Sequence, residues 1–114
     1  MTKKQKLIVI VGPTASGNSE FAVRLAKTLR PRSGQGGEII SADSRQIYRN
    51  LDIGTAKVPG KWVKDKFIYK GIPHYCIDFV SPKKTFTASD YKKCAEKAID
   101  EIVRRGKTPI LAGG

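Results

Sequence analysis

The apolar residues of the chain follow two patterns, continuous runs typical of strands and spacings of three and four typical of helices. These two patterns alternate along the chain. Residues 6–11 (KLIVIV) form a continuous apolar, β-branched run, which is typical of a strand buried on both faces of a parallel sheet. From Ser19 the apolar residues recur at intervals of three and four, which predicts a helix that ends at Pro31. After a turn-rich connector (residues 31–37), residues 38–41 (EIIS) predict a second strand. The first part of the chain is therefore predicted to run strand, helix, strand.

The second half of the chain repeats this alternation after a less regular stretch. Two aromatic and β-branched runs within residues 57–71 predict a small hairpin, and residues 74–80 (HYCIDFV) predict another strand. Residues 87–90 (TASD) match a capping box that would open a helix, and Gly106 is suited to ending it. The buried face predicted for this helix consists of Tyr91, Cys94, Ala95, Ala98, Ile99, Ile102 and Val103. Residues 108–111 (TPIL) predict a final strand.

These elements predict an α/β fold with a parallel sheet flanked by helices. With 114 residues the chain has the length of one modest domain with a single core. Binding loops in such sheets follow the carboxyl ends of strands, and the last predicted strand runs into Gly113 and Gly114 at the end of the sequence. We therefore expect residues 1–114 to be the N-terminal part of a single, longer α/β domain.

Charge is the most informative feature of the composition. Lys and Arg number 22 against 10 Asp and Glu, a formal net charge of +12, which favours a polyanionic partner, above all a nucleic acid. A lysine-rich solvated surface is the simpler explanation, so charge alone decides little. The strongest apolar run, residues 7–11, is too short to span a bilayer, and we expect a cytoplasmic protein without a membrane segment.

The two cysteines, Cys76 and Cys94, come without a C-x-x-C motif or a histidine-rich cluster. A metal site or a redox pair is therefore not expected. We expect both to be reduced thiols, buried or half-buried, as is usual in cytosolic proteins.

Residues 12–19 (GPTASGNS) match a phosphate-binding loop, G-x-x-x-x-G-[KR]-[ST], at every position except Asn18. A Gly-rich turn between a strand and a helix points backbone N–H groups at an anion, at the positive end of the helix dipole. The hydroxyl of Ser19 is a candidate ligand for a magnesium ion. Asn18 still donates hydrogen bonds but brings no positive charge to the terminal phosphates. The alternative interpretation is an ordinary tight turn between a strand and a helix.

Several blocks of sequence give the chain a specific resemblance. Besides GPTASGNS, these are IISADSRQIY (residues 39–48), DIGTAK (52–57), GIPHYCID (71–78) and GKTPILAGG (106–114). In this order, over nearly the whole chain, they resemble the tRNA dimethylallyltransferase family, also called tRNA isopentenyltransferases. The resemblance implies a P-loop NTPase-like core with an inserted helical domain and magnesium dependence. It also implies transfer of a dimethylallyl group from its diphosphate to the exocyclic amine of the adenosine beside the tRNA anticodon.

The resemblance further implies roles for individual residues. The diphosphate would be held by Gly12, Pro13, Thr14, Ala15, Ser16, Gly17, Asn18 and Ser19. The tRNA contact would be formed by Asp43, Ser44, Arg45 and Gln46. Asp43 would also be the general base, because a carboxylate at the carboxyl end of a strand can take the proton of a weakly nucleophilic amine as the bond forms. The simpler interpretations are a helix N-cap for Asp43, a solvated cation for Arg45 and local packing for His74.

Three departures from the family pattern bear on function. Asn18 replaces the family's lysine, and the connector at residues 31–37 is longer than usual, which is harmless at a surface. The family's core continues after Gly113-Gly114 with a threonine that assists the leaving group, and later with the helical insertion. We therefore expect this chain to be inactive alone. As part of a complete enzyme it is expected to be monomeric and to use Mg²⁺, dimethylallyl diphosphate and the anticodon stem-loop of tRNA.

Three other functions stay open. An adenylate isopentenyltransferase would use a free nucleotide as acceptor, although the DSRQ segment and the basic charge favour tRNA. A P-loop kinase or ATPase would need the lysine that Asn18 replaces. A non-catalytic RNA-binding remnant agrees with Asn18 and with the expected truncation, and would bind tRNA in a strongly salt-dependent way.

Overall fold

The computed structural model of the protein describes residues 7–11, 15–33, 36–42, 47–49, 60–81 and 83–113, and for residues 11, 15–19 and 30–33 the backbone only. Six strands form one sheet in the order β1-β6-β2-β5-β4-β3. The parallel strands are β1 (Ile8–Val11), β6 (Thr108–Gly113), β2 (Gly37–Ser41) and β5 (Ile72–Tyr75). An antiparallel hairpin of β4 (Lys66–Tyr69) and β3 (Lys61–Val63) extends the sheet. The predicted α/β class with a mostly parallel sheet is confirmed.

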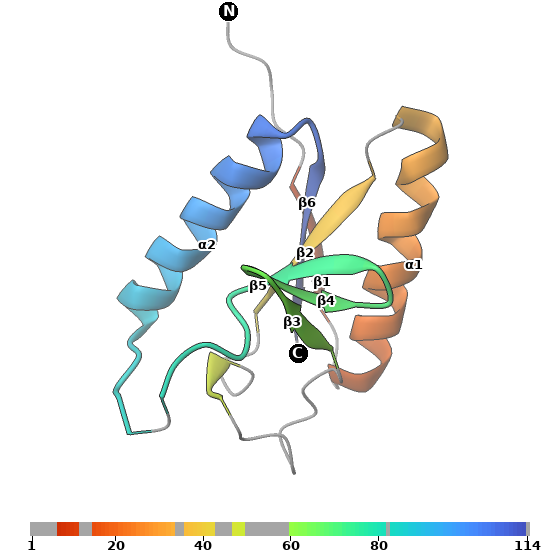
Figure 1. Ribbon diagram of the computed structural model, residues 1–114. Helices are drawn as coiled ribbons and strands as arrows, with labels where there is room; N and C mark the ends of the chain where they lie inside the picture. Colours follow the sequence, from red (N-terminus) through yellow and green to blue (C-terminus); the bar gives the residue numbers. More distant parts are fainter. Residues whose placement is uncertain are drawn as a thin grey trace, which may run out of the picture.

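Two helices cover opposite faces of the sheet (Figure 1). α1 (Ala15–Ser33) packs on the core that contains Ile39, and α2 (Ala88–Arg104) packs on the core that contains Ile40. Side chains alternate between the faces of a strand, so these two neighbours on β2 serve different cores. Every residue of β2 is buried, as the EIIS pattern predicts for a central strand. Neither described helix is long and apolar enough to cross a membrane.

The bounds of α1 differ from those predicted. The helix begins at Ala15, four residues before the predicted start at Ser19, so much of the Gly-rich motif has helical backbone. It also continues through Pro31 to Ser33. A proline in the last turn removes only its own bond to the carbonyl four residues earlier, so one further turn is tolerated before the helix ends.

The middle of the chain forms β5 and the hairpin of β3 and β4. The hairpin predicted within residues 57–71 is present, and its turn contains Lys64 with φ of 58°. The strand predicted over residues 74–80 begins earlier, at Ile72, and ends at Tyr75. The reason is local, because Cys76 and Asp78 have φ of 61° and 57°, a left-handed conformation that an extended strand cannot contain.

Both predicted ends of α2 are confirmed. Thr87 and Asp90 form a capping box: each side chain accepts the backbone N–H of the other residue, at 3.0 Å in both directions. At the other end Gly106 has φ of 77° and its N–H donates to the carbonyl of Val103. The N–H of Lys107 donates to Ile102, which completes a Schellman-type ending.

The expectation of two reduced thiols is wrong. Cys76 and Cys94 form a disulfide with a Cα–Cα distance of 6.2 Å, within the usual range for such a bond. Cys76 follows β5, Cys94 lies on the inner side of α2, and packing of α2 on the sheet brings the two together. Their separation of 18 residues matches no local motif, so the pairing could not be predicted from the sequence.

Candidate functional site

The carboxyl ends of three parallel strands meet at one edge of the sheet (Figure 1). Val11 at the end of β1 pairs with Gly113 of β6, and Ala112 of β6 pairs with Ser41 at the end of β2. The N–H of Ala42 then donates to the carbonyl of Ala112 at 2.8 Å. Ligands of open parallel sheets bind beyond this edge. The residues that precede the predicted diphosphate loop and the predicted base therefore lie on either side of the end of β6.

The described residues include only part of the predicted site. Gly12, Pro13 and Thr14 lie outside them, as do Asp43, Ser44, Arg45 and Gln46. The other loop residues form the first turns of α1, with the backbone alone described: Ala15, Ser16, Gly17, Asn18 and Ser19. The first turn of α1 contains no acidic residue, so no carboxylate of its own neutralises the positive end of the helix dipole.

A close approach of backbones fixes the position of Ala42. A Cβ atom added to Gly113 would lie 2.7 Å from the Cβ of Ala42 and 2.9 Å from its carbonyl carbon. Real Cβ atoms essentially never come this close, so a side chain at position 113 would displace Ala42. The residue that follows Ala42 is Asp43, and the end of β6 therefore sets where the chain leads into the predicted base.

Tyr91 supports the same strand end from α2. Its hydroxyl donates to the carbonyl of Ser41 at 2.7 Å, and Ser41 itself is buried. Burial raises the pKa of Tyr91 to about 12, so the hydroxyl stays protonated and able to donate at neutral pH. The sequence placed Tyr91 on the buried face of the helix. Its bond to β2 was missed, because helical spacing shows which face is buried and not which atoms that face meets.

His74 has the local packing role that the sequence suggested. The side chain is buried in β5, its Nδ1 lies 2.9 Å from the carbonyl of Ile72, and its ring meets Tyr69 edge to face. Desolvation lowers its pKa to about 4, so it is neutral at physiological pH. Since the described residues give it no acidic partner, nothing there completes a catalytic dyad with it.

Metal ligands are not gathered in the described part of the chain. Within residues 7–113, leaving aside those not described, no group of three or more His, Cys, Asp and Glu side chains is placed to hold a metal ion. The side chain of Ser19, the predicted magnesium ligand, is not described. Magnesium binding stays a prediction.

The mostly parallel sheet, with helices on both faces and converging strand ends, defines an α/β protein of the type that binds ligands at the carboxyl edge. The chain belongs to the IPP transferase family, whose model matches residues 46–114. It is 51% identical over its whole length to a tRNA dimethylallyltransferase of Staphylococcus epidermidis, of which it covers 31%. The chain thus spans about a third of the length of this curated relative.

Solved structures show the same similarity. The full-length tRNA isopentenylpyrophosphate transferase of Bacillus halodurans matches 97% of this chain with a TM-score of 0.79 and 43% identity, and 33% of that protein is covered. A eukaryotic dimethylallyltransferase acting on tRNA matches 96% of this chain with a TM-score of 0.72 and 32% identity, and 24% of it is covered. The predicted family resemblance is confirmed.

Proposed function

We propose that this chain forms the donor-binding part of a tRNA dimethylallyltransferase. Membership of the IPP transferase family carries the proposal, because it joins this sheet edge to relatives named for that activity. The complete enzyme would transfer a dimethylallyl group from dimethylallyl diphosphate to the exocyclic amine of the adenosine beside the tRNA anticodon. Since the chain spans about a third of its relatives, we propose the activity for a protein in which the remaining segments are present.

The proposed reaction divides between the two strand ends. Residues 12–19 hold the diphosphate on backbone N–H groups at the start of α1, where the helix dipole stabilises the departing charge. The adenosine nitrogen forms a bond to the allylic carbon while the carbon–oxygen bond to the diphosphate breaks. Asp43, which directly follows Ala42, takes the proton from the nitrogen. Gly113 and Tyr91 contact the end of β2, the strand that leads through Ala42 into Asp43.

We further propose that the hydroxyl of Ser19 would help to hold a magnesium ion beside the diphosphate. Magnesium commonly keeps several waters and binds through substrate phosphates with few protein ligands. Its contribution would be to neutralise charge on the leaving diphosphate. We also expect a monomer in the cytoplasm.

A chimera tests the proposed function. Residues 1–114 would be joined to the downstream segment of the Staphylococcus epidermidis relative, and transfer of labelled dimethylallyl groups to an unmodified anticodon stem-loop measured. We expect turnover by the chimera and at least a hundredfold slower transfer by its Asp43→Asn variant, because general bases contribute factors of this size. An inactive chimera beside an active parent enzyme would argue against the proposal.

The same assay separates the alternatives. Incorporation of label into AMP but not into the stem-loop would identify an adenylate isopentenyltransferase. Phosphate release from ATP would indicate a kinase or an ATPase. Stem-loop binding without transfer would indicate a non-catalytic RNA-binding protein, the alternative that Asn18 favours most.

A further inference from the structure

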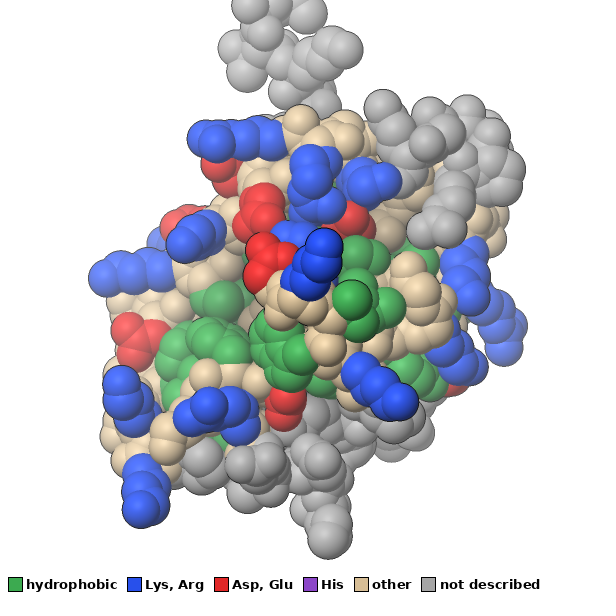
Figure 2. All heavy atoms as spheres, in the orientation of Figure 1, with side chains coloured by type: hydrophobic (Ala, Val, Ile, Leu, Met, Phe, Trp, Pro, Cys, Tyr) green, Lys and Arg blue, Asp and Glu red, His purple; other side chains and the backbone are tan. Residues whose placement is uncertain are grey.

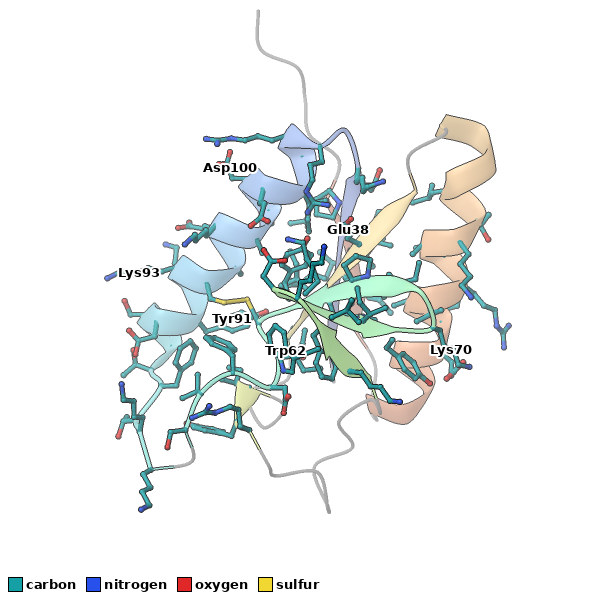
Figure 3. The ribbon with its side chains drawn as sticks, in the orientation of Figure 1. Glu38, Trp62, Lys70, Tyr91, Lys93 and Asp100 are labelled. Carbon is teal, nitrogen blue, oxygen red and sulfur yellow. A yellow bond between two sulfur atoms is a disulfide. The ribbon has the colours of Figure 1, made fainter. Side chains whose placement is uncertain are left out.

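A basic groove borders the candidate site between α2 and the segment after β5. Its volume is about 710 Å³. Four cationic side chains line it: Arg49, Lys84, Lys93 and Lys97. Lys93 stands on the outer side of α2 in Figure 3, and Lys97 follows one helical turn later on the same face. Figure 2 shows Lys and Arg side chains around apolar ones at the lower left of the molecule, beside the first half of α2.

The positive charge of the groove is largely uncompensated in the described part of the chain. The salt bridges recorded there involve other cations, namely Lys66, Lys70, Arg104 and Arg105. The single carboxylate among the lining residues, Asp90, already accepts the backbone N–H of Thr87 in the capping box of α2. This hydrogen bond leaves the negative charge of Asp90 in place, so the groove has four cations and one carboxylate, and the excess of cations favours a polyanion.

An exposed aromatic surface accompanies these cations. Phe79 is 40% exposed, and it meets Phe86 edge to face at 5.7 Å between ring centroids. Both rings line the groove. Cations beside an exposed aromatic face are the combination that binds single-stranded nucleic acid, whose phosphates meet the cations while a base stacks on the ring.

Backbone hydrogen bonds connect the groove to the segments beside the candidate site. The N–H of Arg49 donates to the carbonyl of Val80, and the N–H of Phe79 donates to that of Ile47, both at 2.8 Å. These bonds hold residues 47–49 against the groove, directly after the predicted tRNA contact at residues 43–46. On the other side, the bond from Tyr91 to Ser41 places the first half of α2 beside the end of β2. The groove therefore adjoins the chain on both sides of the predicted tRNA contact.

We propose that the groove binds the single-stranded nucleotides that flank the reacting adenosine. Arg49, Lys84, Lys93 and Lys97 hold their phosphates, and Phe79 stacks on one base. The inference rests on the proposed function and adds to it a surface outside the tRNA contact predicted from the sequence. RNA is favoured over an acidic polypeptide because only RNA offers a planar base to the Phe79 ring.

Salt-dependent binding tests the role of the cations. The 114-residue chain would be titrated into a labelled anticodon stem-loop at several salt concentrations, and the slope of log K against log salt measured. Lys93→Gln/Lys97→Gln removes two groove cations. Lys27→Gln/Lys92→Gln removes two exposed cations that do not line the groove. Two lost phosphate contacts to a single strand should reduce the slope by about 1.4 in the groove variant, and by much less in the control. Equal slopes in the two variants would overturn the proposal.

A second pair of variants tests stacking. Phe79→Leu keeps apolar bulk but loses the flat ring, and Phe21→Leu makes the same change at a 55% exposed position on α1. We expect binding to weaken at least fivefold for Phe79→Leu alone, which is the low end for loss of one stacked base. Equal affinities would overturn the stacking contact. Polyglutamate that competes as well as RNA of equal charge would overturn the choice of RNA.

The binding measurements test the groove separately from the transfer activity of the chimera. Absence of stem-loop binding by the unaltered chain would overturn the groove proposal. An inactive chimera combined with the expected slopes and affinities would leave the groove as an RNA-binding surface and reject the transferase proposal.

Discussion

Asn18 lies in the first turn of α1, at the positive end of the helix, and replaces the lysine of the phosphate-loop pattern. Backbone N–H groups supply most of the anion binding at such a helix start, and this exchange leaves them in place. What is missing is one charge-assisted bond, which exceeds a neutral hydrogen bond by about 1 kcal/mol.

We therefore predict that Asn18→Lys in the chimera speeds single-turnover transfer roughly fivefold or more, while the thermal unfolding temperature changes little. Rapid mixing with labelled donor measures the rate, and calorimetry measures the stability. Equal rates for the two proteins would show that the charge at position 18 does not act on the leaving group.

His74 gives a prediction about pH. It is the single histidine of the sequence, and its pKa is lowered from 6.5 to about 4 by burial. Between these values the unfolded chain binds more protons than the folded one, so the free energy of unfolding falls as the pH drops. The loss should reach about 2 kcal/mol at pH 5.

Urea denaturation at pH 7 and pH 5 measures this loss. His74→Phe keeps a ring against Tyr69 but cannot titrate, so its stability should change about 2 kcal/mol less between the two pH values. The same pH dependence in both proteins would assign the effect to carboxyl groups.

At the scale of elements, a buried ion pair joins α2 to the sheet at the edge opposite the candidate site. Arg105 donates from Nη1 and Nη2 to the two carboxylate oxygens of Glu38, each at 2.7 Å, and Tyr75 of β5 donates to Glu38 at 2.6 Å. Arg105 also donates to the hydroxyl of Tyr75. The hydrogen bond to Glu38 raises the pKa of Arg105 above its ordinary value. The Glu38 side chain is only 3% exposed, so its charge depends on these donors.

Arg105 and its neighbour Arg104 form a matched pair for mutation. Arg105→Met would leave the Glu38 carboxylate buried without its cation, and we expect a loss of about 2–3 kcal/mol, reduced from the fully buried case because Arg105 is one-third exposed. Arg104→Met breaks only an exposed bridge to Asp100 and should cost less than about 0.5 kcal/mol. Denaturant unfolding of the two variants checks this; similar losses would contradict the role of Glu38.

Local sequence signals predicted most elements but not all of their ends. The capping box at residues 87–90 and the stop at Gly106 were reliable, because each involves atoms within one turn of the helix. β5 ended early because Cys76 and Asp78 adopt left-handed conformations, which side-chain type alone does not reveal. Similarly, no local signal connects Arg105 to its partner, Glu38, because Glu38 lies 67 residues away in the sequence.

At the scale of the whole molecule, the Cys76–Cys94 disulfide joins the sheet to α2 and closes a loop of about 18 residues. A cross-link of this span stabilises a folded chain by about 3 kcal/mol, chiefly by restricting the unfolded state. We predict that a reducing agent lowers the free energy of unfolding by this amount. The Cys76→Ser/Cys94→Ser variant should be insensitive to the reducing agent. Two reactive thiols in the unfolded, unreduced protein would show that the bond does not form.

The features that define function here depend on tertiary packing. Sequence blocks identified the family and the residues of the predicted diphosphate loop, because these lie together along the chain. The Tyr91 bond to Ser41, the disulfide and the basic groove each join residues from separate elements, and no periodicity or motif connects such residues. The groove combines Arg49 with Lys97, which lie almost 50 residues apart in the sequence.

Phe79 also lines a second, smaller cavity of about 180 Å³, together with Trp62. Trp62 is the single tryptophan of the chain, and its indole N–H donates to Asp78, the residue before Phe79, at 2.8 Å. Fluorescence excited at the red edge of aromatic absorption therefore comes from the Trp62 indole alone. A base that stacks on Phe79 changes the surroundings of that indole, so occupancy of the groove can be followed optically in unlabelled protein and unlabelled RNA.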